Sequence, residues 1–185
     1  MPFEFEETRI EGVKIAVPEV FQDKRGFFME AYVEEDFKNN GINNEFIQDN
    51  HSKSKKGTLR GLHFQEKPYA QAKLVRCTKG KIFDVSVDLR KDSPTLGEHV
   101  SVELSANNRK MIFIPRGFAH GFLALSETAE AQYKVDNSYA PDKERGIIWD
   151  DSNLDIDWPI DNPKLSDRDQ EWPTFVKLKE KNILF

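Results

Sequence analysis

The chain has 185 residues, of which 38% are hydrophobic and 32% are charged, and its formal net charge is −5 at pH 7. This length suits one domain with a substantial core, so we expect residues 1–185 to form a single domain. The negative charge argues against broad affinity for nucleic acid or an anionic membrane. A few clustered arginines would still suffice to bind a small anion such as a diphosphate.

The cysteine content and the N-terminus predict a cellular compartment. The only cysteine, Cys77, cannot form an intramolecular disulfide, which fits a reducing cytoplasm, and we expect it to be a small apolar filler on a strand. The N-terminus is acidic and lacks the pattern of a signal peptide. No apolar run approaches the roughly 20 residues that span a bilayer. The sequence therefore predicts a cytoplasmic protein.

Alternation of apolar and polar residues predicts strands in the N-terminal half of the chain. The first is VKIAV at 13–17, and GTLRGLHFQ at 57–65 resembles a buried strand. Between them, VEEDFKNNG at 33–41 predicts the one clear helix, with Gly41 at its C-terminal cap. Residues 78–81, Thr-Lys-Gly-Lys, are typical of a hairpin turn.

The second half continues the strand pattern. In 82–89, Phe83, Val85, Val87 and Leu89 share one face, and the other face carries Asp84, Ser86 and Asp88. Further strands are predicted at 100–104, at 111–115, which is apolar throughout, and at 129–135, with loops at 93–95 and 107–108. The last thirty residues are punctuated by prolines, and we expect them to cross the outside of the barrel with a short helix. Many short strands at this spacing favour a β-sandwich or barrel.

Arg60 and His63 stand out within the apolar run 57–65. His63 could be a hydrogen-bonded core residue, a metal ligand or a catalytic base. A fixed cation is costly to bury without an anion, so Arg60 should face either a protein carboxylate or a ligand phosphate.

A second histidine, His120 in IPRGFAHGF, raises the possibility of a metal site between strands. Zinc and iron sites usually need about three or four N, O or S ligands, and Gln65, two places after His63, is a poor ligand. We therefore expect no metal. His51 and His99 have polar neighbours, and we expect them at the surface.

Two further residues on predicted strands each allow a structural and a chemical interpretation. Tyr133 could be a core aromatic with a bonded hydroxyl, or a general acid that protonates a basic enolate carbon. Lys73 lies in an apolar strand, where a lysine is costly unless it meets a charge such as a developing oxyanion. In contrast, the stretches DKRGFF, which contains Arg25, and QDNHS are each ordinary loop chemistry.

Several stretches together resemble one known family. They are DKRGFFMEAY, FIQDNHSKSKKGTLRGLHFQ, AKLVRCTKGKIFDVSVDLRKDSPTLGEH, IPRGFAHGFLAL, YKVDNSYAPDKERGIIWDD and LSDRDQEWP, in this order, over about residues 3–175. This set resembles the dTDP-4-dehydrorhamnose 3,5-epimerase family, and the combination of RGLHFQ, PRGFAHGF and SYAPDKERG is specific to it.

The resemblance implies an all-β, cupin-type jelly-roll β-barrel with short peripheral helices, without a metal or any other cofactor, assembled as a homodimer. It implies conversion of dTDP-4-dehydro-6-deoxy-D-glucose into dTDP-4-dehydro-L-rhamnose, the third step of dTDP-L-rhamnose synthesis. In this reaction the C4 ketone acidifies the protons at C3 and C5. Each is removed to give an enolate, and a proton returns to the opposite face.

The resemblance also implies roles for individual residues. His63 matches the base, Asp169 the carboxylate that orients it, Tyr133 the acid on the other face of the sugar and Lys73 the cation beside the enolate oxygen. His120 matches a position that lines the sugar pocket. The positions that match nucleotide and substrate binding are Arg25, Phe28, Glu30, Gln48, Asp49, Asn50, Arg60, Tyr139, Glu144 and Arg168. In the family, the N-terminal segment that carries Arg25 and Glu30 reaches into the partner subunit and completes its site.

The spacing of Arg60 and His63 adds a geometric expectation. Residues i and i+3 of a regular strand point to opposite faces. If both residues belong to one site, Gly61 should therefore mark a bulge or bend that brings them to the same face.

Alternative functions remain open at this level. A mono-epimerase that inverts only C3 or C5 would share His63, Asp169 and Lys73, although Tyr133 favours the double epimerase. A keto-isomerase fits the RGLHFQ context less well. A non-catalytic nucleotide-sugar binding module would not need the three residues His63, Tyr133 and Asp169 together. Gln65 argues against a metal-dependent cupin oxygenase.

Overall fold

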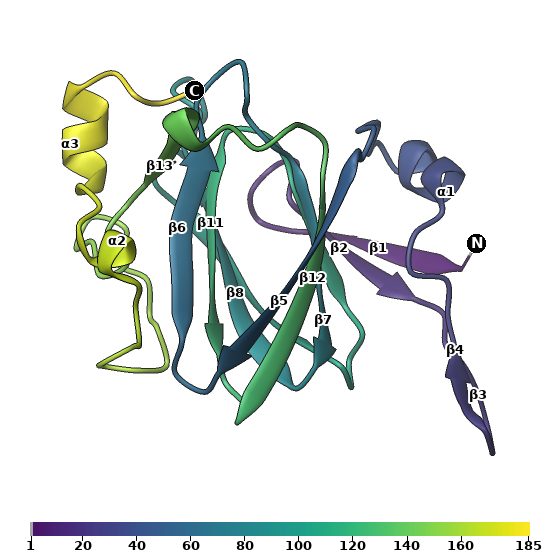
Figure 1. Ribbon diagram of the computed structural model, residues 1–185. Coiled ribbons are helices and arrows are strands. Elements are labelled where there is room, and N and C mark those ends of the chain that lie inside the picture. Colours follow the sequence, from purple (N-terminus) through teal and green to yellow (C-terminus); the bar gives the residue numbers. More distant parts are fainter. Residues whose placement is uncertain (1) are drawn as a thin grey trace.

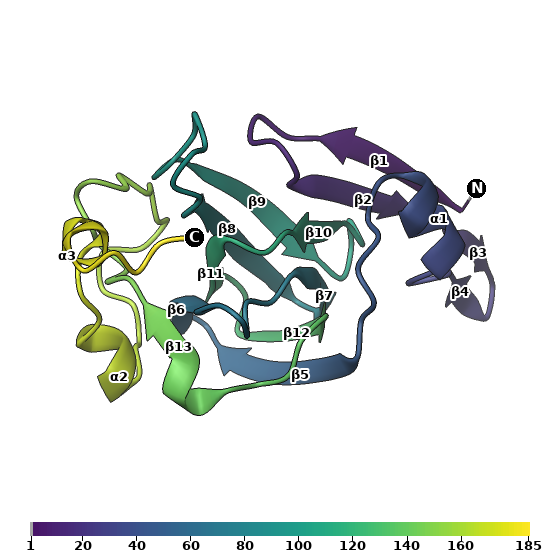
Figure 2. The same cartoon turned by 90° about the horizontal axis from the view of Figure 1, so that it is seen from above.

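The computed structural model describes residues 2–185, and most of its regular structure lies in two antiparallel sheets that face one another (Figures 1 and 2). The six-stranded sheet contains, in spatial order, β1 (Phe3–Glu7), β2 (Lys14–Pro18), β10 (Met111–Ile114), β7 (Lys73–Lys79), β12 (Thr128–Val135) and β5 (Gln48–Lys55). The five-stranded sheet contains β13 (Glu144–Gly146), β6 (Leu59–Gln65), β11 (Phe118–Ala124), β8 (Lys81–Asp88) and β9 (His99–Ser105). The strands predicted from alternation are all present, with ends shifted by one or two residues.

The main core lies between the two sheets. Its buried side chains include Val75 and Cys77 from β7, Ile82 from β8, and Phe118 and Phe122 from β11. The position of Cys77 confirms the expectation of a buried apolar filler. This core closes one part of the space between the sheets and leaves the rest to polar side chains.

Strand β8 is buried on both faces, although its sequence alternates. Val85 and Val87 pack outward against the C-terminal segment, whereas Asp84 and Ser86 point between the sheets and are fully buried. A polar face of a strand is usually a solvated face. Here the polar residues line the interior of the barrel.

The C-terminal segment covers the outer face of the five-stranded sheet, as expected from the sequence (Figure 1). It contains two short helices, α2 (Asp167–Gln170) and α3 (Phe175–Glu180), and a 3₁₀ turn, η1 (Pro141–Lys143), precedes β13. Trp158, Phe175 and Leu178 from this segment pack on Leu59 and Leu123 of the sheet. No helix within residues 2–185 has the length and apolar character needed to cross a membrane.

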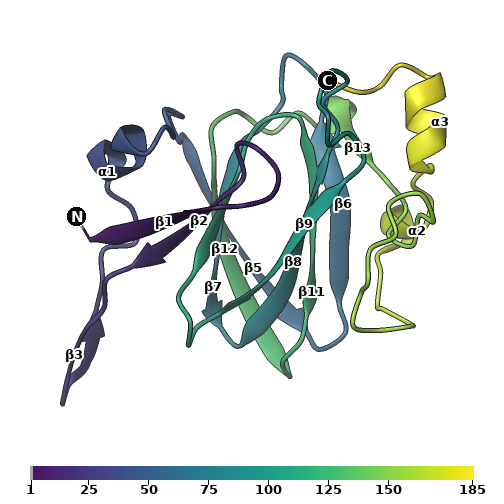
Figure 3. The ribbon, with the colours of Figure 1, turned by 180° about the vertical axis from the view of Figure 1, so that it is seen from behind.

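Helix α1 and the hairpin before it lie at the side of the molecule opposite to the C-terminal helices (Figure 3). Helix α1 (Glu34–Asn39) confirms the predicted helix, and Gly41 follows its cap with a φ of 82°. Phe37 of this helix is fully buried against Leu74 and Met111 of the six-stranded sheet. The hairpin of β3 (Phe21–Asp23) and β4 (Gly26–Phe28), here called the arm, projects away from both sheets.

The predicted hairpin at residues 78–81 is wrong in one respect. The chain does turn at Gly80, where φ is 68°, but β7 and β8 belong to different sheets and do not pair with each other. The segment is a corner through which the chain crosses from one sheet to the other. In sequence, a tight turn between two alternating runs looks the same whether the two strands pair as a hairpin or enter different sheets.

The predicted irregularity at Gly61 is confirmed. His63 pairs with His120 while Arg60 pairs with Phe122, so β6 holds one residue more than β11 over this interval. Gly61 has a φ of 133°, and a Cβ atom placed on it would lie 2.5 Å from the Cα of Gly121. The extra residue turns Arg60 and His63 to the same side of the sheet.

Replacing Gly61 with alanine should destabilise the protein through backbone contact rather than through φ alone. We expect Gly61→Ala to lower the free energy of unfolding by about 3–5 kcal/mol, because positive φ and overpacking both contribute. Gly26 has the same φ of 133° with nothing within 4 Å of an added Cβ, so Gly26→Ala is a matched control that should cost only about 1–2 kcal/mol. Denaturant unfolding of both variants measures the difference, and equal losses would contradict the contact at Gly121.

Candidate active site

A cavity of about 500 Å³ lies between the two sheets and below the C-terminal segment. A smaller cavity of about 300 Å³ adjoins it and shares four of its lining residues, so the two form one continuous site. The predicted residues that line this combined site are His63, Lys73, His120, Tyr133, Asp169, Arg60, Glu144, Arg168, Gln48, Asn50 and Tyr139.

His63 and Asp169 form the shortest polar contact of the site, with His63 Nε2 2.5 Å from Asp169 Oδ1. His63 comes from β6 and Asp169 from α2, 106 residues later in the chain. The side chain of His63 is 23% exposed and that of Asp169 is 5% exposed. A carboxylate at Nε2 holds the proton on that nitrogen, so Nδ1 of the neutral ring carries the lone pair and can act as a base.

Asp169 is held by the start of helix α2. The hydroxyl of Ser166 caps this helix by accepting a hydrogen bond from the Asp169 backbone N–H, and Trp172 donates its indole N–H to Asp169 Oδ1. Burial alone would raise the pKa of the Asp169 carboxyl, but hydrogen bonds from His63, Ser166 and Trp172 outweigh it and lower the pKa below its usual range. The carboxylate is therefore charged at neutral pH.

A second group of polar side chains contains Lys73, His120 and Asp84. His120 Nε2 lies 2.9 Å from Asp84 Oδ2, and His120 Nδ1 lies 3.4 Å from Lys73 Nζ. Asp84 therefore places the proton of His120 on Nε2 and leaves Nδ1 to accept from Lys73. Burial lowers the pKa of Lys73 to about 8, against the opposing charges of Asp84 and Glu144, and burial also lowers the pKa of His120.

Tyr133 faces the site from the six-stranded sheet, whereas His63 faces it from the five-stranded sheet. Burial raises the pKa of the Tyr133 phenol, and the nearby charge of Arg60 only partly offsets this effect. The phenol is thus neutral at physiological pH and retains a proton to donate. The acid and base candidates stand on opposite walls of one cavity.

The rim of the site is a network of charged groups. Arg168 makes two hydrogen bonds to Glu144, at 2.7 and 3.0 Å, and the hydroxyl of Tyr139 donates to the same carboxylate at 2.7 Å. Arg60 donates to Ser54 Oγ at 3.0 Å, and no carboxylate of residues 2–185 lies within ion-pair distance of it. Arg60 lines the cavity but is exposed, so the expectation that it needs an anion to offset its burial does not apply.

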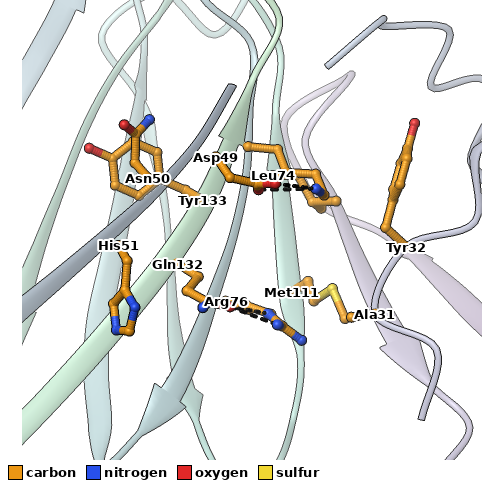
Figure 4. A pocket seen from close by; sticks show the side chains of 11 residues that line it. Ala31, Tyr32, Asp49, Asn50, His51, Leu74, Arg76, Met111, Gln132 and Tyr133 are labelled. Carbon is orange, nitrogen blue, oxygen red and sulfur yellow. Dashed lines mark hydrogen bonds and ion pairs between the residues drawn. The ribbon is translucent and has the colours of Figure 1, made fainter. Parts of the chain in front are cut away.

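The structure does not bring Asp49 to this site. On β5, Gln48 and Asn50 point inward, so Asp49 points to the outer face, where it pairs with Lys134 at 2.9 Å. There it lines a different cavity of about 480 Å³, in which Arg76 is held by Gln132 and Tyr32 stands on a separate N-terminal segment (Figure 4). Side chains alternate between the two faces of β5, so Asp49 faces away from Gln48 and Asn50. The motif QDN alone did not indicate this alternation.

Arg25, Phe28 and Glu30 also lie away from the site. Arg25 and Phe28 belong to the arm, and Glu30 follows it directly. Arg25 pairs only with its neighbour Asp23 at 2.6 Å, and Phe28 is 65% exposed. Within one chain, these side chains have no access to the cavity between the sheets.

The remaining histidines and the metal-ligand candidates can also be located. His51 is exposed as expected, whereas His99 is half-buried and burial lowers its pKa, so the surface prediction for His99 is wrong. Among residues 2–185, no three His, Cys, Asp or Glu side chains come together as a metal site would require. Asp84, Ser166 and Trp172 belong to the site but were not singled out from the sequence, although the Ser-x-x-Asp spacing is a helix-cap signal.

This geometry defines an enzyme class before any comparison is made. A histidine with a carboxylate partner on one wall, and a neutral phenol and a cation on the opposite wall, are suited to moving a proton on a carbon acid. Arginines at the rim suit an anionic substrate. The site is that of a proton-transfer isomerase.

Comparison with known proteins gives the family. The model of the family described as dTDP-4-dehydrorhamnose 3,5-epimerase matches residues 7–177. A dTDP-4-dehydrorhamnose 3,5-epimerase of Shigella flexneri is 55% identical over 91% of this chain and 94% of its own. The chain belongs to the dTDP-4-dehydrorhamnose 3,5-epimerase family and is therefore an isomerase.

Solved structures agree with this assignment and confirm the cupin-type jelly-roll fold. The epimerase of Legionella pneumophila, solved in complex with dTDP-4-keto-L-rhamnose, is 41% identical and superposes with a TM-score of 0.94 over 98% of this chain and 97% of its own. A 3′-monoepimerase of Streptomyces bikiniensis, solved in complex with dTDP-quinovose, is 34% identical with a TM-score of 0.91, over 97% of this chain and 91% of its own.

The depressed pKa of Lys73 predicts a trade-off between the stability of the fold and the activity of the enzyme. We expect Lys73→Met to raise the free energy of unfolding at pH 7 by about 1–2 kcal/mol, because a buried charge is removed, while turnover is lost. The pKa is about 8 in the folded protein and near 10.5 when exposed, so the unfolded wild type binds more protons between these values. Its stability should therefore rise as pH increases from 8 to 10.5, and the variant should lack this rise.

Denaturant unfolding at several pH values tests this prediction, with Lys134→Met as the control. Lys134 forms its ion pair on the outer face of the same sheet, so this variant should change neither the pH dependence nor the activity strongly. A Lys73→Met variant that is less stable than the wild type at pH 7 would contradict it.

Proposed function

We propose that the protein epimerises dTDP-4-dehydro-6-deoxy-D-glucose at C3 and C5 to give dTDP-4-dehydro-L-rhamnose, the third step of dTDP-L-rhamnose synthesis. One observation carries this proposal: the His63–Asp169 pair and Tyr133 face one cavity from opposite sheets, with Lys73 on its wall. Inversion at carbon requires removal of a proton from one face and delivery of a proton to the other. Two walls with complementary acid–base groups meet this requirement.

In the first half of each inversion, Nδ1 of His63 takes the proton from the carbon next to the C4 ketone. The C–H electron pair forms the enolate double bond, and the carbonyl electrons move to oxygen O4. The imidazolium that results is stabilised by Asp169, whose carboxylate is already charged and lies 2.5 Å from Nε2. General bases of this kind contribute about 10²–10⁴-fold to a rate.

In the second half, Lys73 and Tyr133 complete the inversion. The Lys73 ammonium, directed by His120, places positive charge where O4 becomes negative. Tyr133 then donates its proton to carbon from the opposite face, and its raised pKa keeps this proton in place beforehand. The proton on His63 and the phenolate of Tyr133 return to their starting states through solvent.

The rim residues are proposed to bind the nucleotide. Arg60, which has no carboxylate partner, and Arg168 would hold the diphosphate, and Tyr139 would stack on thymine, because its ring is 53% exposed beside the cavity. Gln48 and Asn50 would supply polar contacts from the same wall. Glu144, already bonded to Arg168 and Tyr139, would set the positions of both.

We further propose a homodimer in which the arm of each subunit completes the site of the other. The arm exposes Phe21, Phe27 and Phe28, each more than half accessible, on a two-stranded hairpin that projects from the sheets and contacts Arg109 through Phe27 (Figure 3). Aromatic side chains exposed in this way are typical of interaction surfaces. The docked arm would bring Arg25, Phe28 and Glu30 to the partner's nucleotide. Asp49, on the outer face, has no place in this scheme.

The proposal also includes a single domain and a cytoplasmic location. Residues 1–185 act as one domain, in keeping with N- and C-terminal segments that each pack on one of the two sheets. The enzyme works in the cytoplasm, which its buried, reduced Cys77 fits.

Deuterium incorporation separates the two halves of the reaction. With dTDP-4-dehydro-6-deoxy-D-glucose in D₂O, wild type should place deuterons at both C3 and C5, as counted by NMR and mass spectrometry. His63→Ala should lose exchange by about 10²–10⁴-fold while dTDP still binds. Tyr133→Phe should retain exchange better than net inversion. Near-normal exchange in His63→Ala would contradict the assignment of His63 as the base. A single deuteron in the wild-type product would indicate a mono-epimerase.

Mixed dimers test whether the arm acts on the partner. Arg25→Ala and His63→Ala subunits should each be nearly inactive alone. When they are co-refolded in equal amounts, half of the dimers are mixed and one of their two sites is intact, so about a quarter of wild-type activity should return. A mixture of His63→Ala with Tyr133→Phe is the control, because both residues belong to the same barrel site. No recovery with Arg25→Ala would show that the arm serves its own subunit.

A further inference from the structure

Trp172 contacts the catalytic pair from outside the cavity. Its indole Nε1 donates to Asp169 Oδ1 at 3.2 Å, and the same oxygen lies 2.5 Å from His63 Nε2. The indole ring also meets the imidazole of His63 edge-on, with ring centroids 6.0 Å apart and an interplanar angle of 68°. One side chain thus touches both members of the pair.

The indole itself is fixed by a close approach to the backbone. A Cβ atom on Gly146 would lie 2.5 Å from three atoms of the Trp172 ring, so only glycine leaves room for the ring at this place. Gly146 is the residue of β13 that pairs with His63 on β6. On the other side, the Arg168 guanidinium lies 5.6 Å from the centroid of the indole. The ring is confined between a strand of the barrel and a residue of the nucleotide rim.

We propose that Trp172 is a positioning residue for the proposed epimerisation: its indole N–H fixes the rotation of the Asp169 carboxylate so that Oδ1 stays on Nε2 of His63. This inference rests on the proposed function of the His63–Asp169 pair. A carboxylate is free to rotate about its terminal torsion unless several donors hold it. Two donors that converge on one oxygen, His63 Nε2–H and Trp172 Nε1–H, define that rotation and with it the direction in which Nδ1 points.

The test is a substitution that removes the donor and keeps an aromatic ring. Trp172→Phe keeps an aromatic ring against Gly146 but has no N–H. We expect kcat to fall about tenfold, as loss of one hydrogen bond to a charged group would produce, while KM for the nucleotide sugar changes by less than about threefold. The acid limb of the kcat/KM profile should also move to higher pH, because the Asp169 carboxylate loses a donor that lowers its pKa.

Two further variants separate positioning from general loss of structure. Trp158→Phe is the matched control, because Trp158 Nε1 donates to the Trp149 carbonyl at 2.8 Å, away from the cavity. It should lower Tm comparably and leave the pH profile unchanged. Gly146→Ala keeps the indole but displaces it, and should reproduce the kcat loss and pH shift of Trp172→Phe.

The outcomes are distinct. If Trp172→Phe has the kcat and pH profile of the wild type, Trp172 only fills space and the inference is overturned. If Trp158→Phe shows the same pH shift, the effect is one of stability and the inference fails as well. If wild type itself incorporates no deuterium from D₂O, the proposed function is what fails, since the dTDP-sugar is then not its substrate.

Discussion

The contact between the backbones of Gly61 and Gly121 determines the geometry of the whole site. The extra residue in β6 is accommodated only because neither strand carries a Cβ where they touch. This irregularity turns both Arg60 and His63 inward, so that one strand supplies the proposed nucleotide-binding cation and the proposed base. A regular β6 would direct one of the two away from the cavity.

A second constraint is that the barrel interior is divided into an apolar and a polar part. Side chains such as Val75, Phe118 and Phe122 fill one part, and Lys73, Asp84 and His120 occupy the other. His120 contacts both Asp84 and Lys73, which offsets part of the cost of burying these groups. The same burial gives Lys73 its low pKa and keeps Tyr133 protonated, so the groups owe their chemistry to the packing around them.

The sequence was sufficient for the strands that alternate clearly, for helix α1 and for the bulge at Gly61, because these depend on local alternation and on one glycine within an apolar run. It was wrong about the polar stretches 23–28 and 48–52, which were expected to be loops but lie in the arm and in β5. It failed where pairing is non-local. Residues 78–81 form a turn whichever sheet follows, and the polar face of β8 is buried by strands far away in the chain. Asp84 and Trp172 were missed for this reason, since each gains its role only through a partner on another element. Asp49 was expected in the site because it lies between Gln48 and Asn50. A strand sends adjacent residues to opposite faces, so Asp49 points away from the site.

Asp169 lies on the C-terminal segment, and this position has a consequence for biosynthesis. The strands of both sheets are complete by Gly146, whereas the carboxylate that orients the base is translated more than twenty residues later. Because the ribosome delivers the chain from its N-terminus, the barrel can collapse while the segment that carries Asp169 is still inside the exit tunnel. A chain that lacks this segment would contain every strand of the two sheets, but it would lose both the carboxylate next to His63 and the side chains, such as Trp158 and Phe175, that cover the five-stranded sheet.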